Sequence, residues 1–255
     1  MKKLLFASDL DNTLLFSKRH ASVGDLCVEK IHGEEQGFFT PGTVRLLQEV
    51  QRSGILFLPI TTRSVEQYRR IAWPQGCAPR YAITSNGGVL LDGDREDPAW
   101  GECFRRMISG ETEEIGNWQK RLSEDKRFIR CRIVDGLFLF AYVADGVDAA
   151  ERALEYKSQT SLSVVFSGKK LYFFPRELNK GTAFERFRSP EVCDRTVAAG
   201  DSAIDVPLLR LADTAIVPAS FPKDALSGQS VVRAICGAPF PEFVLSTVLA
   251  EREKL

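Results

Sequence analysis

Continuous apolar runs are the clearest pattern along the chain, at residues 4–7, 55–60, 81–84, 196–199 and 215–217. Runs without polar alternation are typical of parallel strands that are covered on both faces. Amphipathic stretches lie between these runs and predict helices at residues 41–53, 65–73, 181–187, 206–212 and 240–253. Strands that alternate with helices indicate an α/β fold built on a doubly wound, Rossmann-like parallel sheet.

The middle of the chain has a different pattern, in which a helix followed by two strands occurs twice. Helices are expected at 113–123 and 147–158, and strands at 128–134, 137–143, 162–167 and 171–174. This pattern predicts an α+β cap domain with an antiparallel sheet, inserted into the larger domain. We place the inserted α+β cap domain at residues 89–174 and the larger core domain at 1–88 and 175–255. Residues 27–31 and 38–39 are expected to form a flap hairpin around Gly33.

Composition narrows the possible functions. Lys plus Arg and Asp plus Glu both number 34 among 255 residues, so no net charge favours nucleic acid or a membrane surface as a partner. No apolar run approaches the length of a membrane span, and the six cysteines contain no Cys-x-x-Cys pair. We therefore expect a cytoplasmic protein with reduced thiols. Two histidines give little support to a histidine metal site or a Ser-His-Asp triad.

Asp9 and Asp11 directly follow the first predicted strand. In open α/β sheets, ligands bind in the crevice beyond the carboxyl ends of the strands. Two carboxylates this close repel each other unless a cation lies between them, and Mg²⁺ prefers such oxygen ligands. The alternative is a strand-end turn in which Asp11 or Thr13 caps the local backbone.

Two later segments could bind the phosphate group that often accompanies Mg²⁺. Lys180 stands at the predicted start of a helix, where a cation is unfavourable unless an anion is bound there. Thr61 directly follows the run 55–60, so its hydroxyl could donate to a phosphate oxygen. The alternatives are a solvated lysine and a threonine that leads into a helix capped by Ser64. The role of Arg63 is left open between the site and an ordinary helix start.

Asp201 and Asp205 follow the run 196–199 and are one helical turn apart, so both can face the same side of a helix. The alternative is that Asp201 is an N-cap and Asp205 an acid in the first turn. Asn86 precedes two glycines at the expected hinge into the cap, where it is either a turn residue or a contact to the substrate.

These segments together resemble the haloacid dehalogenase superfamily of phosphohydrolases. The first motif is residues 9–13, the second Thr61, the third Lys180 and the fourth residues 200–205. The position of the inserted cap makes the chain similar to the branch that includes the Cof-type, sucrose-phosphate and mannosyl-3-phosphoglycerate phosphatases. Three positions depart from the common motifs: Asn12 and Thr62 stand where glycine is usual, and Ile204 where asparagine is usual.

The resemblance implies a role for each residue. Asp9 would attack phosphorus, and Asp11 would be the general acid and base. Thr61 and Lys180 would bind the phosphoryl oxygens, with Thr62 and Asn86 as further substrate contacts. Mg²⁺ would be bound by Asp9, Asp11 (through its backbone carbonyl) and Asp201, with Asp205 as another ligand or as the partner of Lys180.

The expected function is therefore hydrolysis of a small phosphorylated metabolite, such as a sugar phosphate or phosphorylated glycoside, through an aspartyl-phosphate. The alternatives are a phosphomutase or phosphotransferase with the same intermediate, and a non-catalytic protein that binds phosphorylated ligands. Cap residues Arg130, Arg132, Lys169 and Lys170 are expected to be surface charges more often than ligands. The sequence does not indicate the oligomeric state.

Overall fold

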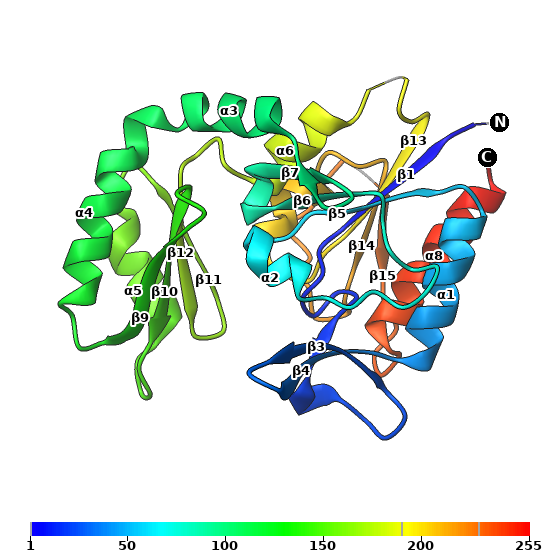
Figure 1. Cartoon of the computed structure of the whole chain (residues 1–255), viewed down its shortest axis with the longest axis horizontal. Helices are drawn as coiled ribbons and strands as arrows, with labels where there is room; N and C mark the ends of the chain where they lie inside the picture. The colour runs from blue at the N-terminus through cyan, green and yellow to red at the C-terminus, as the bar shows by residue number, and fades with distance from the viewer. Residues whose placement is uncertain (1, 190, 229) are drawn as a thin grey trace.

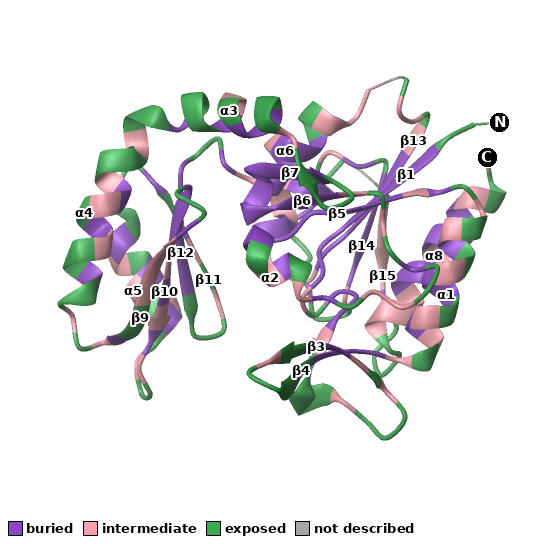
Figure 2. Cartoon of the chain, viewed as in Figure 1, coloured by how far each residue is buried: buried purple, intermediate pink, exposed green. Residues whose placement is uncertain are grey.

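The computed structural model describes residues 2–189, 191–228 and 230–255. Its centre is a parallel sheet whose strands lie in the order β15-β14-β13-β1-β5 (Figure 1). The strands are β1 (Leu4–Ser8), β5 (Leu56–Pro59), β13 (Arg195–Ala199), β14 (Thr214–Val217) and β15 (Ser230–Arg233). Every residue of β1 is buried, as its uninterrupted apolar sequence requires in a central strand covered on both faces (Figure 2).

A smaller sheet continues beyond β5. It contains β6 (Tyr81–Thr84), β7 (Val89–Asp92) and β8 (Arg95–Glu96), which pair antiparallel. A parallel bridge between Ile60 and Ile83 joins it to the end of β5. The chain turns between β6 and β7 through the 3₁₀ segment Ser85–Gly87.

Helices cover the parallel sheet. On one side, α1 (Pro41–Arg52) and α8 (Phe240–Glu253) pack against each other (Figure 1). The Thr40 hydroxyl caps α1 by accepting from the Thr43 amide and donates to Glu242 of α8. The other helices of this part are α2 (Val65–Arg69), α6 (Lys180–Phe187) and α7 (Val206–Leu209). Short 3₁₀ turns occur at Lys18–His20, Ser109–Glu111 and Ala203–Asp205.

An antiparallel sheet in the order β11-β12-β10-β9 forms a separate layer. Its strands are β9 (Phe128–Val134), β10 (Phe138–Val143), β11 (Ser163–Ser167) and β12 (Lys170–Phe174). Helices α4 (Thr112–Ser123) and α5 (Ala149–Lys157) pack on one face and enclose a small apolar cluster around Trp118, whereas Trp100 lies in the larger cluster around the parallel sheet. Helix α3 (Pro98–Met107) leads from β8 toward α4 (Figure 1).

The first strand is followed by a small three-stranded sheet of β2 (Phe16–Ser17), β3 (Leu26–Ile31) and β4 (Glu34–Phe39). Strands β3 and β4 form a hairpin whose turn residues, His32 and Gly33, both have positive φ. The flap hairpin expected around Gly33 is therefore present.

The predicted fold class is confirmed: a parallel α/β sheet is accompanied by a separate antiparallel α+β layer. Strands β2, β7, β8 and β15 and helix α3 were not predicted, and α2 ends several residues before the expected break at Pro74. The reason for the early end is tertiary, because the Ala72 amide donates to the Val28 carbonyl of β3 instead of continuing the helix. The domain boundaries at residues 89 and 174 remain predictions. Within the described residues, no helix combines the length and apolar character needed to cross a membrane.

Candidate functional site

Three neighbouring strands end at the same edge of the parallel sheet. Ser8, the last residue of β1, is paired in register with Ala199 of β13 and with Pro59 of β5. Because parallel strands point the same way, the segments that follow them meet at this edge. The topology therefore brings together Asp9, Thr61 and the loop that starts at Gly200.

Lys180 joins two of these segments. Asn179 caps α6 by accepting from the Thr182 amide, which makes Lys180 the first helical residue. The Lys180 ammonium lies 2.6 Å from Asp9 Oδ1 and 2.6 Å from Asp205 Oδ1, and the residue is only 1% exposed. Burial alone would lower the pKa of Lys180, but Asp205 and Asp9 outweigh burial and raise it, so the lysine is charged.

Three carboxylates surround this single ammonium group. Oxygens of Asp9, Asp201 and Asp205 lie within 4.8 Å of one another. Burial raises the pKa of Asp9 despite the opposing charge of Lys180, and burial together with Asp205 raises the pKa of Asp201 to about 6. Three carboxylates and one ammonium leave a deficit of positive charge, and hard oxygen donors match the preference of Mg²⁺. The donor set therefore fits a divalent cation.

Asp205 and Asp201 differ in their surroundings. Asp205 Oδ1 accepts from Lys180, and its Oδ2 accepts from the amides of Asp201 and Ser202 at 3.1 and 3.0 Å and from the Ser202 hydroxyl at 3.0 Å. A Cβ at position 200 would lie 2.4 Å from the Asp205 Cβ, so this packing requires Gly200. In the described part of the chain, the Asp201 side chain has no ion pair. These contacts favour Asp205 as the partner of Lys180 and Asp201 as the ligand.

Asp11 lies apart from the three clustered carboxylates and is paired with Arg63. Arg63 Nε and Nη2 donate to the two Asp11 carboxylate oxygens at 2.8 Å each. Burial would raise the pKa of Asp11, but the guanidinium outweighs burial and lowers it below the ordinary value. The question left open for Arg63 is thereby answered: it is an ion-pair partner within the site.

The remaining predicted residues lie around this centre. Thr61 is fully buried, and its hydroxyl accepts from the Arg63 amide at 3.2 Å. Asn86 is buried with a positive φ and donates from Nδ2 to the Leu178 carbonyl at 2.9 Å, so it fixes the segment that leads to Lys180. Substrate contacts by Thr61, Thr62 and Asn86 remain predictions.

Two departures from the common motifs have physical explanations. Asn12 has a φ of 60°, in the left-handed region that asparagine tolerates better than most residues other than glycine. Ile204 is buried in the larger apolar cluster, so its side chain contributes to packing.

Sequence reasoning missed two residues that approach the site from other elements. Tyr172 of β12 is buried next to Thr62, where burial first, and then the charges of Asp11 and Asp9, raise the pKa of its hydroxyl. Glu29 of β3 is buried and accepts from Arg63 Nη2 at 2.9 Å. A charged residue inside the otherwise apolar start of β3 was a possible signal for Glu29, but its partner could not be identified from spacing.

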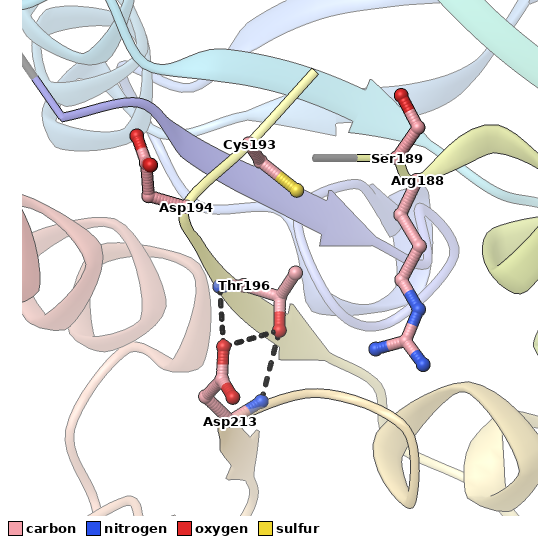
Figure 3. A pocket seen from close by; sticks show the side chains of 6 residues that line it. All are labelled: Arg188, Ser189, Cys193, Asp194, Thr196 and Asp213. Atoms are coloured by element: carbon pink, nitrogen blue, oxygen red, sulfur yellow. Dashed lines mark hydrogen bonds between the residues drawn. The ribbon is translucent and has the colours of Figure 1, made fainter. Parts of the chain in front are cut away.

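A pocket of about 470 Å³ lies away from this site (Figure 3). It is lined by Arg188, Ser189, Cys193, Asp194, Thr196 and Asp213. Thr196 lies near the start of β13, whereas Asp201 follows the end of that strand. The Thr196 amide and hydroxyl both donate to Asp213 Oδ2 at 2.8 Å, so these polar groups are already paired. No predicted site residue lines this pocket.

Comparisons with known proteins agree with the arrangement of the elements. No family sequence model and no curated protein sequence matches the chain. Among solved structures, the sucrose-phosphatase from Synechocystis sp., in complex with sucrose and phosphate, aligns with a TM-score of 0.68 at 16% identity, covering 99% of both chains. A haloacid dehalogenase-like hydrolase from B. subtilis aligns with a TM-score of 0.60 at 18% identity, covering 98% of this chain and 99% of its own.

A trehalose-6-phosphate phosphatase from Aspergillus fumigatus also aligns over 99% of this chain and 93% of its own, with a TM-score of 0.55 and 14% identity. At these identities the likeness concerns the fold, and it extends over the parallel sheet and the antiparallel layer together. The chain therefore has the fold of the haloacid dehalogenase-like hydrolases.

Proposed function

We propose that this protein is a Mg²⁺-dependent phosphatase that hydrolyses a small phosphorylated metabolite through an aspartyl-phosphate. The observation that carries the proposal is the buried Lys180, which lies 2.6 Å from both Asp9 and Asp205 beside a third carboxylate, Asp201. A purely structural ion pair would not need an excess of carboxylates, because uncompensated buried charge is costly. A divalent cation would complete the charge balance and would give an anionic phosphate monoester a positive group to bind.

The first half of the reaction is assigned to Asp9 and Asp11. A carboxylate oxygen of Asp9 forms a bond to phosphorus while the ester P–O bond breaks. The leaving oxygen keeps the electron pair of that bond and takes a proton from Asp11. Because the pair with Arg63 keeps Asp11 ionised in the free protein, Asp11 would first take that proton from the bound monoester in its monoanionic form. Lys180 and the Thr61 hydroxyl hold the phosphoryl oxygens. Asp9, the Asp11 carbonyl and Asp201 would hold a divalent cation, which would supply further positive charge to the phosphoryl group.

In the second half, a water molecule attacks phosphorus and gives its proton to Asp11. The bond between phosphorus and Asp9 then breaks, inorganic phosphate leaves, and both carboxyl groups return to their starting states. Asp205 keeps the Lys180 ammonium in place throughout. Thr62 and Asn86 are assigned to further substrate contacts.

The proposed substrate is a sugar phosphate or a phosphorylated glycoside. The support comes from the solved structures with this fold, which include the sucrose-phosphatase with sucrose and phosphate and the trehalose-6-phosphate phosphatase. Tyr172, which β12 places beside Thr62, adds an aromatic side chain at the edge of the site. The antiparallel layer would then cover the substrate and exclude water.

The test is a phosphate-release screen over sugar phosphates, phosphorylated glycosides, phosphoglycerates, nucleotides and an aryl phosphate, with Mg²⁺ or with a chelator. We expect release from at least one sugar phosphate and none in the chelator. Asp9→Asn should reduce turnover about thousandfold or more while the protein remains folded, since a carboxamide is a poor nucleophile of nearly the same size. Asp92→Asn removes an exposed carboxylate paired with Arg80 and serves as the matched control. Full activity in Asp9→Asn would exclude the assigned nucleophile.

A further inference from the structure

The β3–β4 hairpin places a buried carboxylate, Glu29, behind the candidate site. Acidic side chains are rarely buried unless they are paired. The hairpin makes room for Glu29 by placing Gly37 on the facing strand, where an added Cβ would lie 3.0 Å from the Glu29 Cβ and 3.1 Å from its Oε2. Gly37 therefore leaves room for the Glu29 side chain within the hairpin.

Glu29 binds two arginines that come from a different part of the fold. Its Oε2 accepts from Arg63 Nη2 at 2.9 Å, and its Oε1 accepts from Arg70 Nε at 3.2 Å. Arg63 in turn donates to both oxygens of Asp11, and its Nη1 donates to the Gln67 carbonyl at 3.3 Å. Every nitrogen of the planar Arg63 guanidinium thus has an acceptor, which fixes the plane in which Asp11 is held.

Exposure changes steadily along this chain of ion pairs. The exposed fraction of the side chain is 4% for Glu29, 12% for Arg63 and 43% for Asp11. The series of ion pairs is therefore buried at Glu29 in the hairpin and exposed to solvent at Asp11, the carboxylate assigned to the reaction. Buried ion pairs contribute little net stability, because the cost of removing both charges from water offsets their attraction. A role in holding Asp11 explains the arrangement better than stability does.

We infer that Glu29 is a positioning residue for Asp11 and acts through Arg63. The inference rests on the proposed function, in which Asp11 gives its proton to the leaving oxygen as the ester P–O bond breaks. Loss of Glu29 removes the buried acceptor of Arg63 Nη2, so the guanidinium is held less firmly and the Asp11 carboxyl is oriented less strictly. The effect depends on the leaving group, because a strongly basic leaving oxygen requires that proton and a weakly basic one departs without it.

The experiment compares two aryl phosphates that differ in the basicity of the leaving oxygen, phenyl phosphate and para-nitrophenyl phosphate. For Glu29→Gln, kcat/KM should fall about tenfold or more with phenyl phosphate. This loss is smaller than the rate gain of about a hundredfold or more that general acid catalysis usually provides, because Asp11 itself remains. With para-nitrophenyl phosphate, the fall should be less than about threefold, because nitrophenolate needs little protonation. The loss should be in kcat, since Glu29 does not contact the phosphate.

Two further variants separate positioning from folding. Glu66→Gln removes an exposed carboxylate that also pairs with Arg70, and it should leave kcat/KM unchanged with both substrates. Glu29→Asp keeps the charge but shortens the side chain, so it should show the same dependence on leaving group, and it replaces Glu29→Gln if that variant does not fold. An equal loss on both substrates, or no loss, would overturn the inference while the proposed function stands. If the unmodified protein with Mg²⁺ hydrolyses neither aryl phosphate nor any phosphate of the release screen, the proposed function itself fails.

Discussion

Lys180 is surrounded by more negative charge than it can neutralise, and this shapes the behaviour of each acidic residue nearby. Asp205 has both oxygens engaged by protein donors, whereas Asp201 forms no ion pair among the residues described. Two aspartates four residues apart in one loop are therefore expected to respond differently to the same substitution.

Asp205→Asn should destabilise the protein by about 3 kcal/mol, because the buried Lys180 loses one of its two charged partners and the carboxamide cannot accept all the hydrogen bonds that Asp205 accepts. Asp201→Asn should leave the melting temperature in a chelator unchanged or slightly higher, because it relieves repulsion between carboxylates. It should abolish the stabilisation by Mg²⁺. Thermal melts of both variants with and without Mg²⁺ check this. If Asp201→Asn is the less stable variant in the chelator, the two roles are reversed.

Mg²⁺ binding should depend on pH because protons compete for the same carboxylates. Without the cation, burial and neighbouring charge raise the pKa of Asp201 from 3.8 to about 6 and raise the pKa of Asp9 as well. The folded, cation-free protein then holds more protons than the unfolded chain, so this contribution to stability is present at low pH and is lost as pH rises through about 6.

The cation reverses that loss by binding the deprotonated carboxylates. We expect the affinity for Mg²⁺ to be about tenfold or more weaker at pH 5 than at pH 7, since each proton displaced costs about tenfold per pH unit below the pKa. Calorimetric titration at several pH values measures the effect. An affinity that does not change over this range would mean that Asp9 and Asp201 are not the ligands.

At the scale of elements, the start of α6 is held tightly against α7. A Cβ at Gly181 would lie 2.6 Å from the Pro207 carbonyl oxygen, and backbone atoms at such a contact must move. Gly181→Ala should therefore destabilise the protein by about 2 kcal/mol through overpacking and reduce turnover by displacing Lys180.

Gly116 offers a matched control because it lies inside α4 with open space around its Cα. Gly116→Ala should stabilise the protein by about 0.5–1 kcal/mol, since alanine loses less conformational freedom in a helix. Denaturant unfolding measures both free energies. Equal effects at the two positions would contradict the close packing of α6 on α7.

The elements also show which part of the site the sequence could predict. Asp9, Thr61 and Asp201 each follow an apolar run, and the parallel order of β13, β1 and β5 is enough to bring their segments to one edge. Lys180 was found from its place at a helix start. These predictions depend on local pattern and on one general property of parallel sheets.

Glu29, Arg63 and Tyr172 could not be assigned in this way. Their places depend on the register of the hairpin and on how β12 approaches the parallel sheet, and sequence spacing fixes neither. Helix α3 was missed although it has local signals, because Asp97 caps it by accepting from the Trp100 amide and Trp100 and Phe104 lie on its buried face. Strand β15 is at most partly buried, so its short sequence gave a weak signal. The side chains that were missed are therefore those that reach the site from elements whose packing against the parallel sheet is not set by local sequence.

At the scale of the whole molecule, the turn between β9 and β10 connects the antiparallel layer to the larger part. Asp135 in this turn accepts from the Val65 amide at the start of α2 at 3.1 Å and from the Ser85 hydroxyl. Leu137, in the same turn, lies against Gly88, where an added Cβ would be 2.3 Å from its Cδ1. If the antiparallel layer moves away from the larger part, we expect the contacts of this turn to break.

Asp135→Ala should weaken that contact by about 1 kcal/mol, which is the typical net contribution of one hydrogen bond to stability. The rate of amide exchange at Val65 should therefore increase about fivefold. Asp145→Ala is the matched control, because Asp145 pairs with Lys169 inside the antiparallel layer. Hydrogen exchange followed by mass spectrometry gives the comparison. Faster exchange at Val65 in Asp145→Ala, but not in Asp135→Ala, would argue against this connection.

The two apolar clusters each contain their own intrinsic fluorophore. Trp118 lies 5.2 Å from Tyr156 and 5.1 Å from Phe173 between ring centres within the small cluster, whereas Trp73 and Trp100 belong to the larger one. Replacing either set with phenylalanine leaves an emission signal that reports on one layer alone. Melting curves followed by this emission would therefore resolve whether the two layers lose their structure in one cooperative step or one after the other.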